Sequence, residues 1–71
     1  MKMVSVESSH IKAIGYDEAT KKMRVEYTQA SYEYSDVAKE VYEQIMKADS
    51  KGRALREAIS TNNLAYKRLE D

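Results

Sequence analysis

The spacing of apolar residues changes once along this chain, between Asp36 and Val37, and that change limits what the chain can fold into. Before it, the segment 22–28 alternates apolar and polar side chains, which is the period of a β-strand with one buried face. After it, apolar residues recur every three or four positions, which is the period of an amphipathic helix. Strands followed by helices in a chain of 71 residues predict one α+β domain.

Three strands are expected in the first half of the chain. The segments 11–17, 22–28 and 31–35 are rich in β-branched and aromatic residues, and short polar stretches separate them. They predict a three-stranded antiparallel meander. The apolar residues of the segment 4–6 and of the tail 64–69 leave room for one extra short terminal strand. We therefore expect one domain over residues 1–71 with its core at about 4–67.

Tyr32 and Tyr34 stand two positions apart, so their side chains share one face of the third strand. In one interpretation they pack in the core with Met23, Val25 and Tyr27. In the other they form a platform on which nucleic-acid bases stack. Both interpretations stay open from the sequence.

The register between the second and third strands follows from the loop that joins them. If Gln29-Ala30 is a two-residue loop, Tyr27 opposes Tyr32 and all apolar side chains fall on one face. A four-residue loop or a bulge is the alternative, because Gln-Ala lacks the Gly or Asn that a tight turn prefers. The same register sets Glu26 opposite Glu33, a like-charge pair that costs stability.

Two helices are expected in the second half. The first carries the apolar stripe of residues 37–48, and Asp36 is placed to cap its start. Ser50 is the expected N-cap of the second helix, and Asn62 and Asn63 are expected to end it in a left-handed turn.

The chain offers no arrangement typical of catalysis. It has no cysteine and a single histidine, His10, which excludes disulfides and multi-histidine zinc sites. Ser8-Ser9-His10 has the residue types of a nucleophile and its base, but adjacent side chains of an extended chain diverge, so these residues are interpreted as structural. We expect neither enzyme activity nor a cofactor. Since no apolar run matches a bilayer span or a signal peptide, a cytoplasmic protein is expected.

The positive charge of this formally neutral chain is concentrated in its second half. Residues 45–69 hold six Lys or Arg and two Asp or Glu. The start of the second helix has free backbone amides, and Gly52 would let an anion approach them. The candidate anion-binding residues are Lys47, Ser50, Lys51, Gly52, Arg53 and Arg56. A capped, solvated helix start is the alternative.

The segments SSHIKAIGYD, YEYSDV, VYEQI and ADSKGRALREAI resemble the KTSC domain, and the resemblance covers roughly residues 5 to 67. The family takes its name from the C-terminus of certain lysyl-tRNA synthetases and also occurs as small stand-alone proteins of bacteria and phages. The synthetase context implies RNA binding. The sequence departs from the family pattern in having Ala30-Ser31 where Gly is usual, Ala38 where Pro often stands, and Leu55-Arg56 where an aromatic residue and Asn are usual.

Two functions are therefore carried forward. The first is a small module that binds RNA or another single-stranded nucleic acid through its basic helix start. The alternative is a protein-interaction or regulatory module, such as a phage-encoded protein that docks on a host partner. An exposed strand edge would also allow a homodimer.

Overall fold

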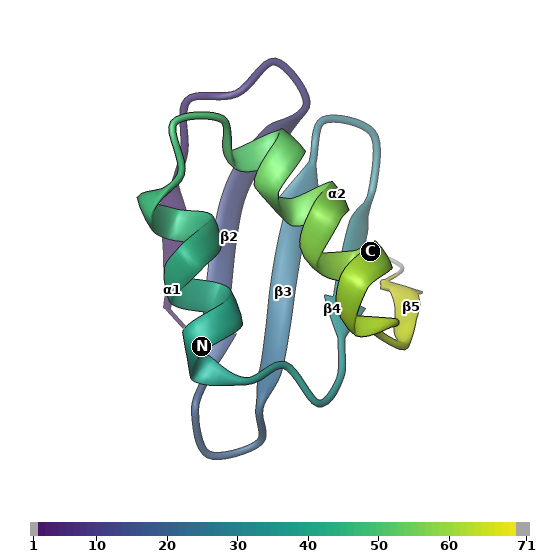
Figure 1. Ribbon diagram of the computed structural model, residues 1–71. Helices are drawn as coiled ribbons and strands as arrows, with labels where there is room; N and C mark the ends of the chain where they lie inside the picture. Colours follow the sequence, from purple (N-terminus) through teal and green to yellow (C-terminus); the bar gives the residue numbers. More distant parts are fainter. Residues whose placement is uncertain (1, 70–71) are drawn as a thin grey trace.

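The computed structural model describes residues 2–69 and shows one antiparallel sheet of five strands with two helices on one of its faces (Figure 1). The strands lie in the order β1-β2-β3-β4-β5, and both helices come between β4 and β5 in the chain. The elements are β1 (Met3–Ser5), β2 (Ile11–Asp17), β3 (Lys22–Tyr27), β4 (Ser31–Tyr34), α1 (Lys39–Lys47), α2 (Lys51–Asn62) and β5 (Tyr66–Leu69).

The α+β class and the central meander of three strands are confirmed, but the number of strands is larger than predicted. A short strand is added at each end: β1 pairs with β2, and β5 pairs with β4. The helices are thus followed by a strand and are not C-terminal. β1 and β5 are short edge strands, three and four residues long, and each pairs with one neighbour. The homodimer through a strand edge would use β1 or β5, and it stays a prediction.

The predicted register between β3 and β4 is wrong by two residues. Tyr27 N donates to Ala30 O over 2.8 Å, so Thr28 and Gln29 form the loop. Val25 then opposes Tyr32, and Met23 opposes Tyr34. A shift of two keeps every side chain on its predicted face, since side chains alternate with a period of two.

The observed register also removes the like-charge pair. Arg24, not Glu26, lies opposite Glu33, and Arg24 Nη2 is 3.2 Å from Glu33 Oε2. Lys22 Nζ lies 3.8 Å from the other carboxylate oxygen of Glu33. Opposite charges across neighbouring strands stabilise their pairing, whereas the predicted register would have placed two carboxylates together.

A β-bulge in β2 turns its first residue toward the helices. Lys12 and Ala13 together oppose Glu26, so the alternation of side chains is interrupted there. As a result Ile11 and Ile14, three residues apart, are both buried in the core.

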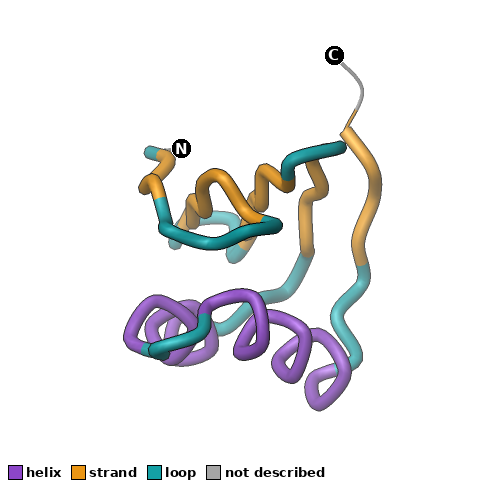
Figure 2. The backbone as a smooth tube through the Cα atoms, turned by 90° about the horizontal axis from the view of Figure 1, so that it is seen from above, coloured by secondary structure: helices purple, strands orange, loops and turns teal. Residues whose placement is uncertain are grey.

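The core lies between the sheet and the helices, which form two layers (Figure 2). α1 lies over the β2 side of the sheet, and α2 crosses β3 toward β4 (Figure 1). The buried apolar residues are Ile11, Ala13, Ile14, Met23, Val25, Tyr34, Val37, Ile45 and Leu55. None of the helices in residues 2–69 is long and apolar enough to cross a membrane.

The two helices begin differently. The predicted cap by Asp36 is wrong: α1 has Ala38 as its N-cap, without a side-chain hydrogen bond, and Asp36 lies outside the helix with a φ of 55°. The main-chain bond from Val37 N to Lys21 O, 2.8 Å long, fixes the chain just before α1. The Ser50 cap is confirmed, because Ser50 Oγ accepts from Arg53 N over 3.4 Å. At the end of α2 the left-handed residue is Asn63.

Candidate functional site

A hollow of about 570 Å³ lies at the end of the sheet where three distant segments meet. These segments are the loop 8–10 before β2, the end of β3 at Tyr27, and the first three turns of α2. A main-chain bond from Thr28 N to His10 O, 3.0 Å long, holds the loop beside the end of β3. The lining residues are Ser8, Ser9, His10, Ile11, Tyr27, Ser50, Gly52, Arg53, Leu55, Arg56, Ile59 and Ser60.

The floor of the hollow is apolar and its rim is polar. Ile11 and Leu55 are almost fully buried, and Ile59 packs against the same core. The β2 bulge supplies Ile11 to this floor, and the apolar stripe of α2 supplies Leu55 and Ile59. Serines, a histidine and arginines surround the floor. An apolar base with a few polar groups at its edge is the usual composition of a small-ligand pocket.

Gly52 lies where α2 passes the loop 8–10. A Cβ atom built at this glycine would lie 3.6 Å from Ser8 Oγ and 3.9 Å from Ile11 Cδ1, which are ordinary contacts. The glycine is therefore not needed for the packing of the helix against the loop. Its lack of a side chain leaves the backbone of the first helical turn accessible from the hollow.

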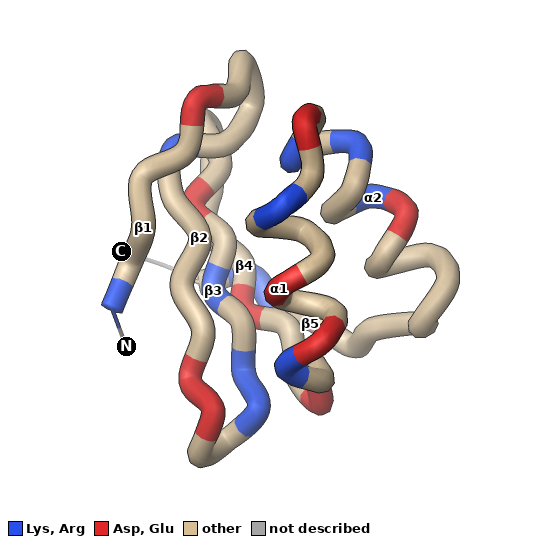
Figure 3. Tube along the Cα trace, turned by 60° about the vertical axis from the view of Figure 1, so that its left-hand side comes forward, with Lys and Arg blue, Asp and Glu red and all other residues tan. Residues whose placement is uncertain are grey.

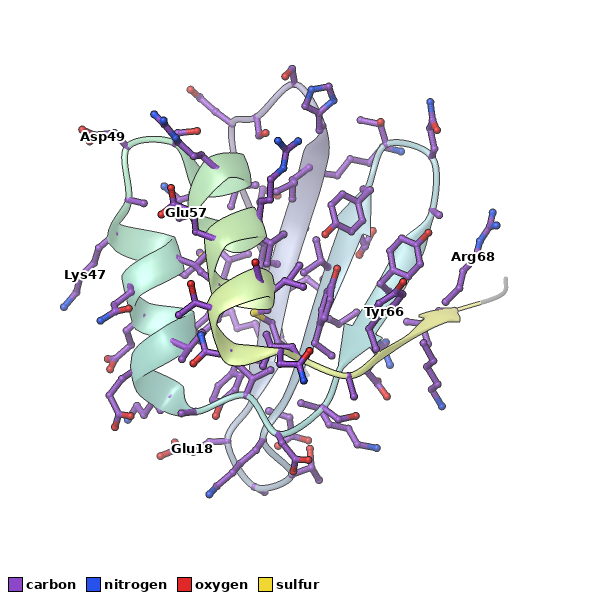
Figure 4. The ribbon with its side chains drawn as sticks, turned by 45° about the vertical axis from the view of Figure 1, so that its right-hand side comes forward. Glu18, Lys47, Asp49, Glu57, Tyr66 and Arg68 are labelled. Carbon is purple, nitrogen blue, oxygen red and sulfur yellow. The ribbon has the colours of Figure 1, made fainter. Side chains whose placement is uncertain are left out.

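Four of the six predicted anion-binding residues line the hollow, namely Ser50, Gly52, Arg53 and Arg56. Lys51 does not, and its Nζ donates to Ala48 O over 3.3 Å. Lys47 ends α1 and points away from the hollow (Figure 4). The six candidate residues therefore do not all face the hollow. Lys47 belongs to α1, whereas the other five lie at the N-cap or in the first two turns of α2.

The two arginines give the rim its positive charge. Arg53 Nε lies 3.8 Å from Glu57 Oε1, but both side chains are more than two-thirds exposed, so this pair holds the guanidinium only weakly. Arg56 forms no ion pair with any of residues 2–69. No Asp or Glu among the described residues lines the hollow. Figure 3 shows the basic positions at the start of α2, and both acidic and basic positions on α1.

Ser8, Ser9 and His10 were interpreted as structural, and the structure shows both a structural contact and a place in the hollow. Ser8 Oγ accepts a hydrogen bond from His10 N over 3.3 Å, which is a turn contact. All three residues nevertheless line the hollow opposite α2. Sequence reasoning missed this role because nothing in the local pattern places the loop 8–10 beside a helix that begins forty residues later. The loop 8–10 and the start of α2 both belong to the segments that resemble the KTSC family, and this was the one sign in the sequence that linked them.

The two tyrosines of the third strand have different surroundings. Tyr34 is buried, and its hydroxyl lies 2.8 Å from that of Tyr27. Burial raises the pKa of both hydroxyls above the ordinary value of 10, so both are protonated at neutral pH. Tyr32 is half-buried and makes edge contacts with Tyr27 at 5.5 Å and with Tyr66 at 5.6 Å between ring centres. The core interpretation thus describes Tyr34, whereas Tyr32 lies at the border of the core.

Comparison with known proteins agrees with this architecture. The model of the KTSC domain family matches residues 7–62, a range that contains every residue lining the hollow. An uncharacterized protein of Stutzerimonas stutzeri is 32% identical over 71 residues, which is 99% of this chain and 100% of that protein. The crystal structure of a KTSC domain protein from Yersinia pestis superposes with a TM-score of 0.89 at 27% identity and covers 97% of each chain.

Proposed function

The chain belongs to the KTSC domain family, and from this premise we propose that it is a small non-enzymatic module that binds single-stranded nucleic acid, with RNA as the expected form. The binding site is the hollow between the loop 8–10 and α2. One observation supports this proposal above the others: the hollow combines an apolar floor with two arginines at its rim. A nucleotide has the matching parts, a flat apolar base and an anionic phosphate.

The phosphate would bind at the start of α2. Arg53 and Arg56 lie one turn apart on this helix and both face the hollow. Guanidinium groups bind phosphate through two parallel hydrogen bonds, and the amides of the first helical turn favour an anion in addition. Since the whole chain is neutral, the attraction is local and depends on these positions rather than on net charge.

The base would lie against Ile59 and Tyr27, the partly exposed apolar residues of the hollow, with the buried Ile11 and Leu55 beneath them. A base reaches such a floor only when it is unpaired and turned out of the stack. A regular duplex keeps its bases paired and presents only phosphates to a hollow of this shape. The geometry therefore favours single strands, loops and ends over duplexes.

The test is a binding titration with labelled single-stranded RNA, single-stranded DNA and duplex at low salt, read by fluorescence anisotropy. The double variant Arg53→Glu/Arg56→Glu should lose at least about tenfold in affinity for single strands, because both phosphate contacts are replaced by repulsion. The matched control is Lys39→Glu/Lys47→Glu on α1, which changes the net charge equally outside the hollow. The control should bind within about twofold of the parent, and thermal melting should show that both variants fold.

Gly52→Ala sharpens this experiment. The added methyl group makes only ordinary contacts in the fold, so melting should be unchanged or slightly higher. A loss of affinity would mean that the ligand reaches the backbone of the first helical turn. If wild-type protein binds no nucleic acid at low salt, or if the α1 control loses as much affinity as the hollow variant, the proposal is overturned. The protein-interaction module, including one that docks on a host partner, would then take its place.

A further inference from the structure

A second hollow of about 370 Å³ adjoins the first along the end of the sheet. The two share His10 and Tyr27 and so adjoin at these residues, and we call the two hollows together the groove. The second hollow continues past the β3–β4 loop to the edge of the sheet. Its lining residues are His10, Tyr27, Thr28, Gln29, Ala30, Tyr32 and Arg68.

Two tyrosines, Tyr27 and Tyr32, line this second hollow, and no residue of α1 or α2 does. Tyr32 packs edge-on against Tyr66 of β5, with 86° between the ring planes. Tyr66 is 62% exposed, and it is one of only two large apolar residues so exposed within residues 2–69. Figure 4 shows Tyr66 on the edge strand β5, at the lateral edge of the sheet that α2 does not cover. Tyrosine rings placed at the surface offer faces on which bases stack.

Arg68 supplies a positive charge at the far end of the groove. It lies opposite Tyr32 in the β4–β5 register, so both side chains are on the helix face of the sheet. Its neighbour Lys67 lies opposite Glu33 and projects from the other face. Neither hollow has a carboxylate among the residues that line it within the described chain, while three arginines and His10 do line them.

We propose that the groove is one binding path, in which Tyr32, Tyr66 and Arg68 hold the continuation of a single strand whose first two nucleotides occupy the hollow at α2. This inference rests on the proposed function and adds to it a second half of the site and the length of the ligand. From α2 to the edge of the sheet, the groove has Arg53 and Arg56, then Tyr27, then Tyr32 with Arg68 opposite it. Tyr66 packs against Tyr32 beside the groove. A strand that follows the groove would meet guanidinium groups for its phosphates and aromatic rings for its bases.

The length of the path follows from the size of the protein. The largest dimension of the Cα trace is 29 Å, and the groove crosses one end of the sheet. A single strand of about four nucleotides fills such a path, at the lower end of the site sizes known for small binding domains. A dinucleotide would occupy the first hollow alone.

The test compares a single-stranded RNA of about eight nucleotides with a dinucleotide, using Arg68→Glu and its matched control Lys67→Glu. For the longer RNA, a plot of log affinity against log salt concentration should have a slope of about −2 if three arginines contact phosphates. With two such contacts the slope should be about −1.4. Arg68→Glu should reduce the slope accordingly and weaken the longer RNA at least about fivefold. Lys67→Glu should leave both quantities near their parent values, and neither variant should change dinucleotide binding.

Tyr66 gives an independent readout. Tyr66→Ala should weaken the longer RNA at least about fivefold through lost base stacking, and Tyr66→Phe should restore binding because the ring is kept. If the parent binds the longer RNA and both Arg68→Glu and Tyr66→Ala bind it equally well, the second half of the site is refuted while the proposed function stands. If the parent binds no nucleic acid, the proposed function fails and this inference fails with it.

Discussion

Two pairs of tyrosines on the helix side of the sheet differ in whether a helix covers them. On the β2 side, Tyr16 stacks on Tyr42 of α1 at 4.9 Å between ring centres, and its hydroxyl donates to Val37 O. On the β4–β5 side, Tyr32 and Tyr66 meet edge-on, and Tyr66 remains mostly exposed. We call these the covered pair and the open pair.

The difference comes from where the helices lie rather than from the residues. α1 lies over the β2 side, whereas α2 crosses β3 and leaves the outer strand edge uncovered (Figure 1). A tyrosine therefore contributes to the core near β2 and to the surface near β5, although the residue type is the same. It follows that changes at the covered pair should act on stability, and changes at the open pair should act on binding.

Tyr34 lies at the border between the two pairs and should give the largest effect. It is 4% exposed, and Tyr34→Ala should cost about 3–5 kcal/mol of unfolding free energy, the range for truncating a buried aromatic residue. Urea denaturation measures this loss, with Tyr66→Ala expected within about 0.5 kcal/mol of the parent as the surface control. A Tyr34→Ala protein that unfolds at the parent's midpoint but has lost its ligand would place Tyr34 with the open pair.

The pH dependence of stability should report the burial of Tyr34. Burial raises the pKa of Tyr34 above 10, so between the unfolded and folded values the unfolded chain has released a proton that the folded chain retains. Stability from this group is therefore complete below pH 10 and falls as the pH rises above it, by up to about 1.4 kcal/mol per unit. Urea unfolding on both sides of pH 10 measures the slope. Tyr34→Phe should reduce it, and an unchanged slope would assign the effect to other tyrosines.

Ser50 is the N-cap of α2. Ser50→Ala removes the acceptor of Arg53 N and should cost about 0.5–2 kcal/mol of stability, whatever the function is. Ser50→Asp, which keeps an acceptor at this position, is the matched control and should retain the parent's stability. An unchanged denaturation midpoint for Ser50→Ala would mean that the helix start is held by other contacts.

Removing single hydroxyl groups should give the smallest effects and the most direct comparison. Tyr16→Phe removes the hydrogen bond to Val37 O and should cost about 0.5–1.5 kcal/mol. Tyr66→Phe alters an exposed ring and should change stability by less than about 0.5 kcal/mol. Chemical denaturation of the two variants side by side tests the contrast. Equal losses would mean that the edge strand contributes to stability as much as the covered side does.

The sequence by itself determined the elements whose pattern is local. The alternation in β3 identified its buried face, and the helical stripe identified the residues of α1 and α2 that enter the core. Ser50 was recognisable as a cap because a hydroxyl at that position bonds an amide three residues later. The Asp36 side chain could also accept a hydrogen bond from a helix amide, but Asp36 does not stand at the N-cap position of α1. The contact of Val37 with the β2–β3 turn delays the start of α1, so this cap is not made.

Tertiary structure decided whatever depends on which distant segments meet. A period of two specifies a face but does not distinguish registers that differ by two residues, so the pairing of Arg24 with Glu33 had to come from the fold. The sequence predicted one extra terminal strand where the fold has two, and β5 brings Tyr66 and Arg68 beside Tyr32. The groove exists because packing places the loop 8–10 against α2. Local sequence sets which side chains can be buried, and only long-range packing sets which of them are left together at the surface.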